Sequence, residues 1–146
     1  MNILLLSPGG AFASALESLP LDRDRDRVTL VTAVASDAQD ASPLIRLGAA
    51  ALPSRSRLAR ALESSVIGRN IKRLSPLDGS RRFAAAARRS AELRRAVAQA
   101  DLIVALERDS VLAAWKALHG WAPAGTRGVF GLAPARALLT SRRRAV

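Results

Sequence analysis

The chain of 146 residues contains no cysteine and a single histidine, His119. Without cysteine it can form neither a disulfide framework nor a thiolate metal site, which suits a reducing compartment. A single histidine also excludes a multi-histidine metal site within the chain, and we interpret His119 as a helix-terminal residue rather than a catalytic one. We therefore expect neither a metal nor a cofactor.

Tyrosine is absent as well, and aromatic residues make up only 3% of the chain. This scarcity excludes the aromatic platform on which proteins stack single-stranded nucleic acid. We expect Trp115 and Trp121 to be packing residues. Apolar residues still reach 49%, which is too high for a disordered composition, so the core must be built mainly from Leu, Val, Ile and Ala.

No stretch approaches the roughly 18–20 apolar residues that a membrane-spanning helix needs. No basic region precedes the apolar run at residues 1–6, and Pro8, Gly9 and Gly10 interrupt that run soon after it starts. We interpret it as a buried first strand and not as a signal peptide. The expected location is cytoplasmic, with a peripheral position at the inner face of the membrane as the alternative.

Acidic residues are few in the second part of the chain. Residues 1–50 carry four Arg and six acidic residues, a net charge of −2, whereas residues 51–146 carry 19 basic and six acidic residues, a net charge of +13. This asymmetry predicts an anionic partner for the second part. The alternative is a basic surface that is merely solvated and has no partner. Arginine supplies 21 of the 23 basic residues, which is the usage that a high-GC coding bias would produce.

Apolar runs alternate with amphipathic stretches along the chain, and this alternation predicts a parallel sheet with helices on both faces. The fold class we expect is α/β, with one doubly wound, mostly parallel, Rossmann-like sheet in a single domain over residues 1–131. A basic tail, 132–146, would be a short helix or disordered. The expected strands are 3–6, 28–34, 49–52, 101–106 and 129–130, and the expected helices are 12–16, 42–47, 54–74, 80–100 and 111–118.

Ligands of such sheets bind outside the carboxyl ends of the strands. Ser7, Gly9 and Gly10 follow the first strand, where glycines let a ligand approach the backbone and a helix start favours an anion. The spacing matches neither the dinucleotide fingerprint nor a phosphate-binding loop, so a plain tight turn is the alternative.

Three acidic residues also follow strands at this edge. Asp37 stands where dinucleotide-binding folds place a ribose-binding acid, but without the glycine fingerprint a loop acid or a helix cap is the favoured interpretation. Glu107 and Asp109 are both candidate ligand-binding residues, and either carboxylate could act as a general base. The alternative is that Glu107 pairs with Arg108 in solvent. Asp109, like Ser110, is well placed to cap the helix that follows.

The stretches 54–74 and 80–100 read as two basic helices. Ser80 is the expected N-cap of the second, in which Arg81, Arg88 and Arg95 recur every seven residues. Such helices could lie on an anionic membrane or bind the phosphates of nucleic acid. Nucleic acid is the less favoured partner, because no motif that reads DNA or RNA accompanies the helices. Their apolar residues would serve equally well to pack them on the sheet. The basic surface we predict comprises Arg55, Arg57, Arg60, Arg69, Arg73, Arg81, Arg88 and Arg95.

The run Ala-Asp-Leu-Ile-Val-Ala-Leu-Glu at residues 100–107, followed by a helix, resembles the N-terminal half of GT-B glycosyltransferases. That family's half-domains also open with a strand and a Gly-rich turn, here Asn2 to Gly10. The chain departs from the family in three ways: it lacks paired glutamates eight residues apart, its strand-end acid is Glu107 rather than Asp, and no second domain for the sugar donor follows. The resemblance therefore implies an acceptor-side half-module that has a separate donor-side partner subunit or has lost catalysis.

Two functions follow from these observations. The first is a Rossmann-like module that binds a phosphorylated or sugar-like ligand at the glycine edge, as one subunit of a two-component glycosyltransferase. The second is a non-catalytic interaction domain that docks through its basic helices on a partner protein, an anionic membrane or nucleic acid. Catalytic residues stay unassigned at this point, and so does the question of whether the chain is an enzyme.

Overall fold

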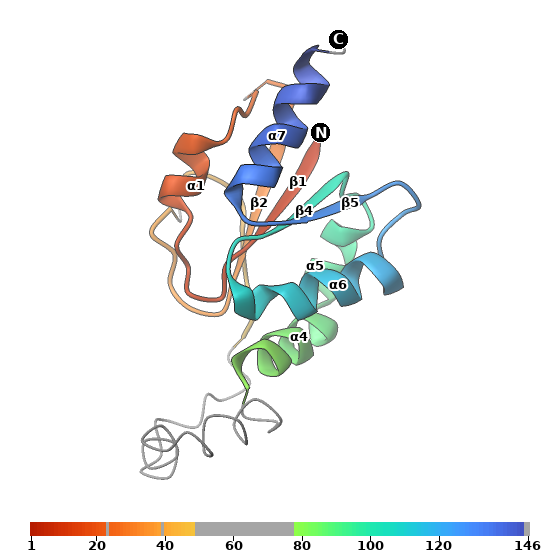
Figure 1. Ribbon diagram of the computed structural model, residues 1–146. Coiled ribbons are helices and arrows are strands. Elements are labelled where there is room, and N and C mark those ends of the chain that lie inside the picture. Colours follow the sequence, from red (N-terminus) through yellow and green to blue (C-terminus); the bar gives the residue numbers. More distant parts are fainter. Residues whose placement is uncertain (23, 39, 49–77, 145–146) are drawn as a thin grey trace, which may run out of the picture.

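The structure is a computed structural model that describes residues 1–22, 24–38, 40–48 and 78–144. In this part of the chain, five strands form one parallel sheet in the order β3-β2-β1-β4-β5. The predicted α/β, Rossmann-like fold is thereby confirmed. Strands β2, β1, β4 and β5 of this sheet are labelled in Figure 1. The strands are β1 (Asn2–Leu6), β2 (Arg27–Thr32), β3 (Leu44–Arg46), β4 (Leu102–Ala105) and β5 (Arg127–Phe130).

The central strand β1 shows why an uninterrupted apolar run becomes a strand here. Its side chains alternate between the two faces of the sheet, and both faces are covered, so every position from Ile3 to Leu6 is buried. Strands β2 and β4 flank it, with Leu5 opposite Leu30 on one side and Val104 on the other. The chain reverses its direction of winding between β1 and β4, which is the switch point of such a sheet.

Helices cover both faces, as the prediction of a doubly wound sheet requires (Figure 1). One face carries α1 (Ala13–Ser18) and α7 (Leu132–Arg144). The other face carries α4 (Gly79–Arg89), α5 (Ala91–Val97) and α6 (Val111–Gly120). A single 3-10 turn, η1 (Arg108–Ser110), leads from β4 into α6.

Large and small side chains are divided unevenly between the two cores. On the α1 and α7 face, Phe12 is fully buried among leucines and isoleucines. On the other face α4 packs against α6, and the buried residues of these two helices are nearly all alanines: Ala84, Ala87, Ala113, Ala114 and Ala117. The alanine richness of the sequence is thus used where two helices approach each other closely.

The third strand lies earlier in the chain than expected. The short helix predicted at 42–47 is wrong, because Leu44–Arg46 is strand β3, paired with Leu30 to Thr32 of β2. Ile45, a β-branched residue, is buried against the α4 to α6 face, so the burial that the sheet edge provides outweighs the helix-start signal of Ser42 and Pro43. The strand expected at 49–52 and the helix expected at 54–74 lie outside the described residues.

The single helix predicted over 80–100 is instead two helices, α4 and α5, which meet at Ser90. The backbone of Ser90 is extended, and its Oγ accepts a hydrogen bond from the Leu93 N–H at 3.1 Å. This serine caps a new helix, and serines are well suited to that role. Ser80 is not the N-cap of α4, because that position belongs to Asp78, whose carboxylate accepts a hydrogen bond from the Ser80 hydroxyl at 2.8 Å.

The segment after residue 131 forms α7, which packs on the sheet. Ala135 and Leu139 are buried in the core shared with α1. Arg136 lies on the exposed side of α7, and its Nε and Nη2 donate to the Ser18 carbonyl oxygen at 2.9 and 2.6 Å, where α1 ends. The tail considered in the sequence as a short helix or disordered is therefore a helix tied to α1.

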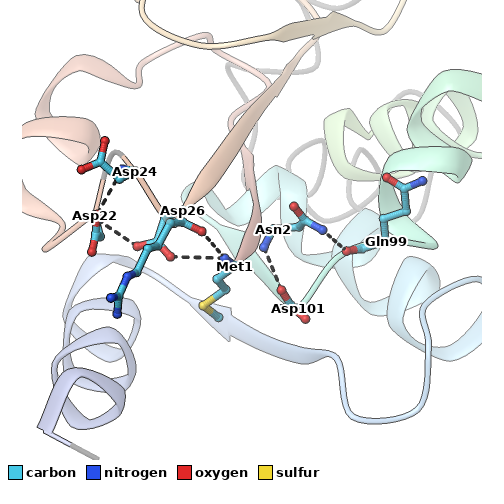
Figure 2. A network of polar contacts seen from close by, with 8 residues as sticks. Met1, Asn2, Asp22, Asp24, Asp26, Gln99 and Asp101 are labelled. Atoms are coloured by element: carbon cyan, nitrogen blue, oxygen red, sulfur yellow. Dashed lines mark hydrogen bonds and ion pairs between the residues drawn. The ribbon is translucent and has the colours of Figure 1, made fainter. Parts of the chain in front are cut away.

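Polar contacts close the amino-terminal end of the sheet (Figure 2). The amino group of Met1 forms an ion pair with Asp26 at 3.5 Å, and Asp26 also accepts from the Asp22 N–H at 2.9 Å. Asp101 accepts from the Asn2 N–H at 2.8 Å. The segment between α1 and β2 thus contributes Asp26 to an anchor for β1.

Within the described ranges, no helix combines the length and the apolar character needed to cross a membrane.

Candidate functional site

All but one of the predicted site residues come together around the loop after β1, at the switch point between β1 and β4. The Leu106 N–H donates to the Leu6 carbonyl oxygen at 3.0 Å, which extends the pairing of the two strands by one residue. This pairing carries Glu107 to the loop that follows β1. The Ser7 N–H continues the ladder on the other side by donating to the Val31 carbonyl oxygen at 3.0 Å.

Glu107 binds this loop through both of its carboxylate oxygens. Oε1 accepts a hydrogen bond from the Ser7 hydroxyl, and the Gly9 N–H donates to Oε1 and Oε2 at 3.2 and 3.3 Å. Glu107 is half-buried, whereas Ser7 is completely buried. The carboxylate therefore has one side fixed by the loop and another open to solvent.

Both roles of the Ser7 hydroxyl are taken within the protein. It donates to Glu107, and its Oγ accepts from the Ala11 N–H at 3.1 Å. Because Ser7 is buried as well, a substrate cannot reach it. Ser7 therefore positions Glu107 and shapes the loop, and it does not fit the part of a nucleophile.

Asp37 binds the next segment of the same loop. Its Oδ1 accepts from the Phe12 and Ala13 N–H groups at 2.7 and 3.1 Å, at the start of α1. Its own N–H donates to the Gly10 carbonyl oxygen at 3.1 Å. Of the three interpretations of Asp37, the contacts correspond to a helix cap, with the side chain otherwise exposed.

Gly10 is required by the backbone at this point. Its φ of +77° is left-handed, and a Cβ added to it would lie 2.2 Å from the Ala35 carbonyl oxygen. Gly9 is exposed and has an ordinary φ, and a Cβ there would meet Oε1 of Glu107 at 3.0 Å. The two glycines therefore differ: Gly10 permits the close crossing of two loops, and Gly9 leaves room for the Glu107 carboxylate.

The N–H groups that could hold a phosphate at this loop are thus bound to the protein's own carboxylates. Gly9 donates to Glu107, and Phe12 and Ala13 donate to Asp37. Two carboxylates facing one short loop repel an anion. Their remaining oxygen lone pairs can accept hydrogen bonds from hydroxyl or ammonium groups instead.

Asp109 lies apart from this cluster. It belongs to η1, and a Cβ added to Gly79, the first residue of α4, would come within 2.4 Å of its Oδ2. Ser110 precedes α6, but its hydroxyl donates back to the Glu107 carbonyl oxygen at 2.6 Å and does not cap the helix. The cap function expected of these two residues at α6 is therefore not observed.

The aromatic residues are arranged differently from the prediction. Trp121 is partly buried against the α4 to α6 core as expected, but Trp115 is 55% exposed on α6, so the packing role predicted for it is wrong. His119 stacks on Trp115 with ring centroids 4.5 Å apart, and its Nδ1 lies 2.9 Å from the Trp115 carbonyl oxygen. The Trp115 indole therefore lies at the solvent-exposed side of α6, where His119 stacks on it.

Thr32 is a residue of this region that the sequence did not indicate. It is completely buried at the end of β2, and its Oγ1 accepts from the Val34 N–H at 3.2 Å and donates to the Pro8 carbonyl oxygen at 3.5 Å. Thr32 thereby joins the loops after β1 and β2. A β-branched residue in a strand is so common that its polar role could not be read from sequence.

The basic surface can be followed only in part. Arg81, Arg88 and Arg95 are all exposed, but the break at Ser90 places Arg95 on a different helix from the other two. Arg55, Arg57, Arg60, Arg69 and Arg73 lie outside the described residues. No group of three or more His, Cys, Asp or Glu side chains suited to a metal ion occurs in the portion of the chain described.

Comparison with known proteins finds no match: no family model, no curated protein and no solved structure resembles the chain significantly.

Proposed function

We propose that the carboxyl edge of the sheet binds a neutral, hydroxyl-rich ligand of the sugar class, with Glu107 as the principal acceptor. The observation that carries the proposal is the placement of Glu107: its carboxylate is fixed on the Ser7 and Gly9 loop at the switch point and still open to solvent on one side. Among the described contacts, Oε2 of Glu107 accepts only from the Gly9 N–H, so its remaining lone pair can accept a hydrogen bond from a hydroxyl of a sugar ring.

The geometry favours the sugar part of the expected ligand over its phosphate. A phosphate at this loop would have to displace Glu107 or Asp37 from the N–H groups they occupy, and it would approach two negative charges. This preference is consistent with the resemblance to the acceptor-side half of GT-B glycosyltransferases. In an enzyme of that kind, Glu107 would orient the acceptor hydroxyl and take up its proton, while a donor-binding domain outside these 146 residues supplies the activated sugar.

The test is a titration of the 15N-labelled protein, followed by amide chemical shifts, with neutral methyl glycosides in one series and nucleotide diphosphates and sugar phosphates in another. We expect a methyl glycoside to shift the amides of Gly9, Gly10 and Ala11. Glu107→Gln should weaken this binding about tenfold or more, because a charged acceptor is replaced by a neutral one. Glu92→Gln removes an exposed carboxylate on α5 and serves as the matched control.

Two results would contradict this proposal. One is a phosphate-bearing ligand that shifts the loop amides at lower concentration than any neutral sugar does. The other is the absence of any shift at the loop with the whole neutral series at tens of millimolar.

A second function rests on a separate observation. Arg88, Arg89, Arg94 and Arg95 are exposed on α4 and α5 and form no ion pair within the described residues. Uncompensated charge of this kind suits docking on an anionic membrane, on an acidic protein or on the phosphates of nucleic acid. Vesicle co-sedimentation with anionic lipid should be weakened by Arg88→Glu with Arg95→Glu, and by raising the salt concentration. Binding to neutral vesicles with equal strength would contradict this function.

A further inference from the structure

Strand β5 is the edge of the described sheet on the β4 side (Figure 1). Of its four residues, Arg127, Gly128 and Phe130 are exposed, and Phe130 exposes 56% of its surface. A strand edge with an exposed large apolar side chain is a template for pairing with another strand. The question is which strand fits it.

The free hydrogen-bonding groups of β5 belong to two residues. The Arg127 N–H donates to the Asp101 carbonyl oxygen and the Gly131 N–H to the Ala105 carbonyl oxygen, at 3.0 and 2.9 Å. In a parallel pair, alternate residues direct both backbone groups to the same neighbour. The N–H and C=O groups of Gly128 and Phe130 therefore point away from β4, toward the open edge.

Gly128 and Phe130 also share one face of the sheet. Val129 packs in the core with α1 and α7, so its two neighbours face the α6 side. A Cβ added to Gly128 would lie 2.1 Å from Leu118 of α6, which confirms that side. On this face the edge therefore presents Gly128, which has no side chain, and Phe130, whose ring is exposed to solvent.

We propose that this edge pairs with β5 of a second copy of the chain, antiparallel about a twofold axis at Val129. In that register Gly128 of each copy stands opposite Phe130 of the other. All four outward residues then form hydrogen-bonded pairs, which gives four N–H···O=C bonds across the axis. Each Phe130 ring then packs against the other copy's Leu118, the side chain that covers Gly128 on that face.

Other registers fit less well. Antiparallel strands related by a twofold axis must place residues of the same face opposite each other, which leaves axes at Gly128, Val129 or Phe130. An axis at Phe130 would pair Gly128 with Leu132, which is already in helix α7. An axis at Gly128 would pair Phe130 with Thr126, whose N–H is bound to the Pro123 carbonyl oxygen at 3.1 Å.

Size and charge define what kind of dimer this is. Two strands of four residues bury far less than the roughly 1,600 Å² of a standard interface, so the dimer should be weak and in exchange with monomer. Each copy carries a formal charge of +11, so the copies repel one another and added salt should strengthen the dimer. An anionic partner at the same edge would show the opposite dependence on salt.

The first experiment is sedimentation velocity over a concentration series at low and at high salt. We expect a monomer–dimer equilibrium whose dissociation constant falls as salt rises. Phe130→Lys should raise that constant about tenfold or more, since it replaces the central apolar contact by a charge. Val34→Lys changes another exposed apolar residue, 39% exposed in the loop after β2, and should leave a dimer weakened only by its added charge.

The second experiment tests the register and does not depend on a strong dimer. The chain has no cysteine, so Val129→Cys introduces a single thiol, which the axis would place about 4.5 Å from its counterpart between Cα atoms, within the range of a disulfide. Oxidised glutathione should then crosslink this variant to a covalent dimer. Val34→Cys, far from the axis, should crosslink much more slowly. Circular dichroism checks that both variants are folded.

The proposal is overturned if Val129→Cys crosslinks no faster than Val34→Cys. It is equally overturned if the wild-type protein sediments as a monomer at high salt up to about 1 mM, where even weak specific pairs associate. Association that weakens with salt and requires an added polyanion would assign the edge to an anionic partner and would also overturn the pairing of two copies.

Discussion

The consequence of Gly10 for stability can be predicted in detail. Gly10→Ala adds one methyl group where φ is +77° and where that group would lie 2.2 Å from the Ala35 carbonyl oxygen. Left-handed backbone costs a non-glycine residue about 1–2 kcal/mol. The carbonyl oxygen can move little, because it belongs to the loop that Asp37 fastens to the Gly10 carbonyl oxygen. Forcing a methyl into such a space costs a further ~1–3 kcal/mol.

The expected loss in the free energy of unfolding is therefore about 2–5 kcal/mol, a large share of the typical stability of a domain. Urea denaturation followed by circular dichroism measures it. Two other glycines separate the contributions. Gly125 has a φ of +99°, and a Cβ added to it would meet no atom within 4 Å. Gly125→Ala should therefore lower the free energy of unfolding only by the left-handed penalty of about 1–2 kcal/mol.

Gly9→Ala completes the comparison. Its φ is ordinary and its new methyl meets only the end of the Glu107 side chain, so it should lose less than about 1 kcal/mol. The reasoning is refuted if Gly10→Ala is no more destabilising than Gly125→Ala, because the close approach to Ala35 would then carry no cost. A loss for Gly9→Ala equal to that for Gly10→Ala would likewise refute the distinction between the two glycines.

Three further predictions concern named contacts, each measured by the same denaturation. Asp37→Ala removes the acceptor of two N–H groups at the start of α1 and should cost about 1–2 kcal/mol, whereas Asp37→Asn should keep most of that stability; equal losses would contradict the capping role. Ser90→Ala should cost about 1 kcal/mol by removing the cap of α5, and Ser141→Ala, on the exposed side of α7, should cost less. Phe12→Ala truncates the largest of the fully buried side chains described and should lower the free energy of unfolding by about 3–5 kcal/mol. A loss under about 1 kcal/mol would show that the core beneath α1 collapses to fill the cavity.

The sequence predicted the parts of the fold that depend on local pattern. Uninterrupted apolar runs identified β1 and β4, because strands buried on both faces need no polar alternation. Strand β3 escaped prediction for the opposite reason. Its three residues, Leu44–Arg46, carry little local signal, and only pairing with β2 makes them a strand.

The site was predicted as a region and not as a set of contacts. Parallel strands bring their carboxyl ends to one edge, so Gly9 and Glu107 could be expected near each other although 98 residues separate them. Which backbone groups the carboxylates would bind depends on the register of β1 with β4 and on the turn at Gly10. Neither is encoded in a short motif. The sequence therefore could not show that Asp37 would cap α1 while Asp109 would lie beside α4, away from the loop after β1.

The contact between α4 and α6 has a consequence for how this protein tolerates mutation. Ala84, Ala87, Ala113 and Ala117 are at most 2% exposed, and none of them has a side-chain torsion to lose on folding. A smaller residue there leaves almost no hole, whereas any larger one must force the two helix axes apart. Substitution at this contact is therefore limited chiefly by side-chain size. Glycine loses only its helix penalty of about 1 kcal/mol, so a library of variants should return serine and glycine there more often than valine or leucine.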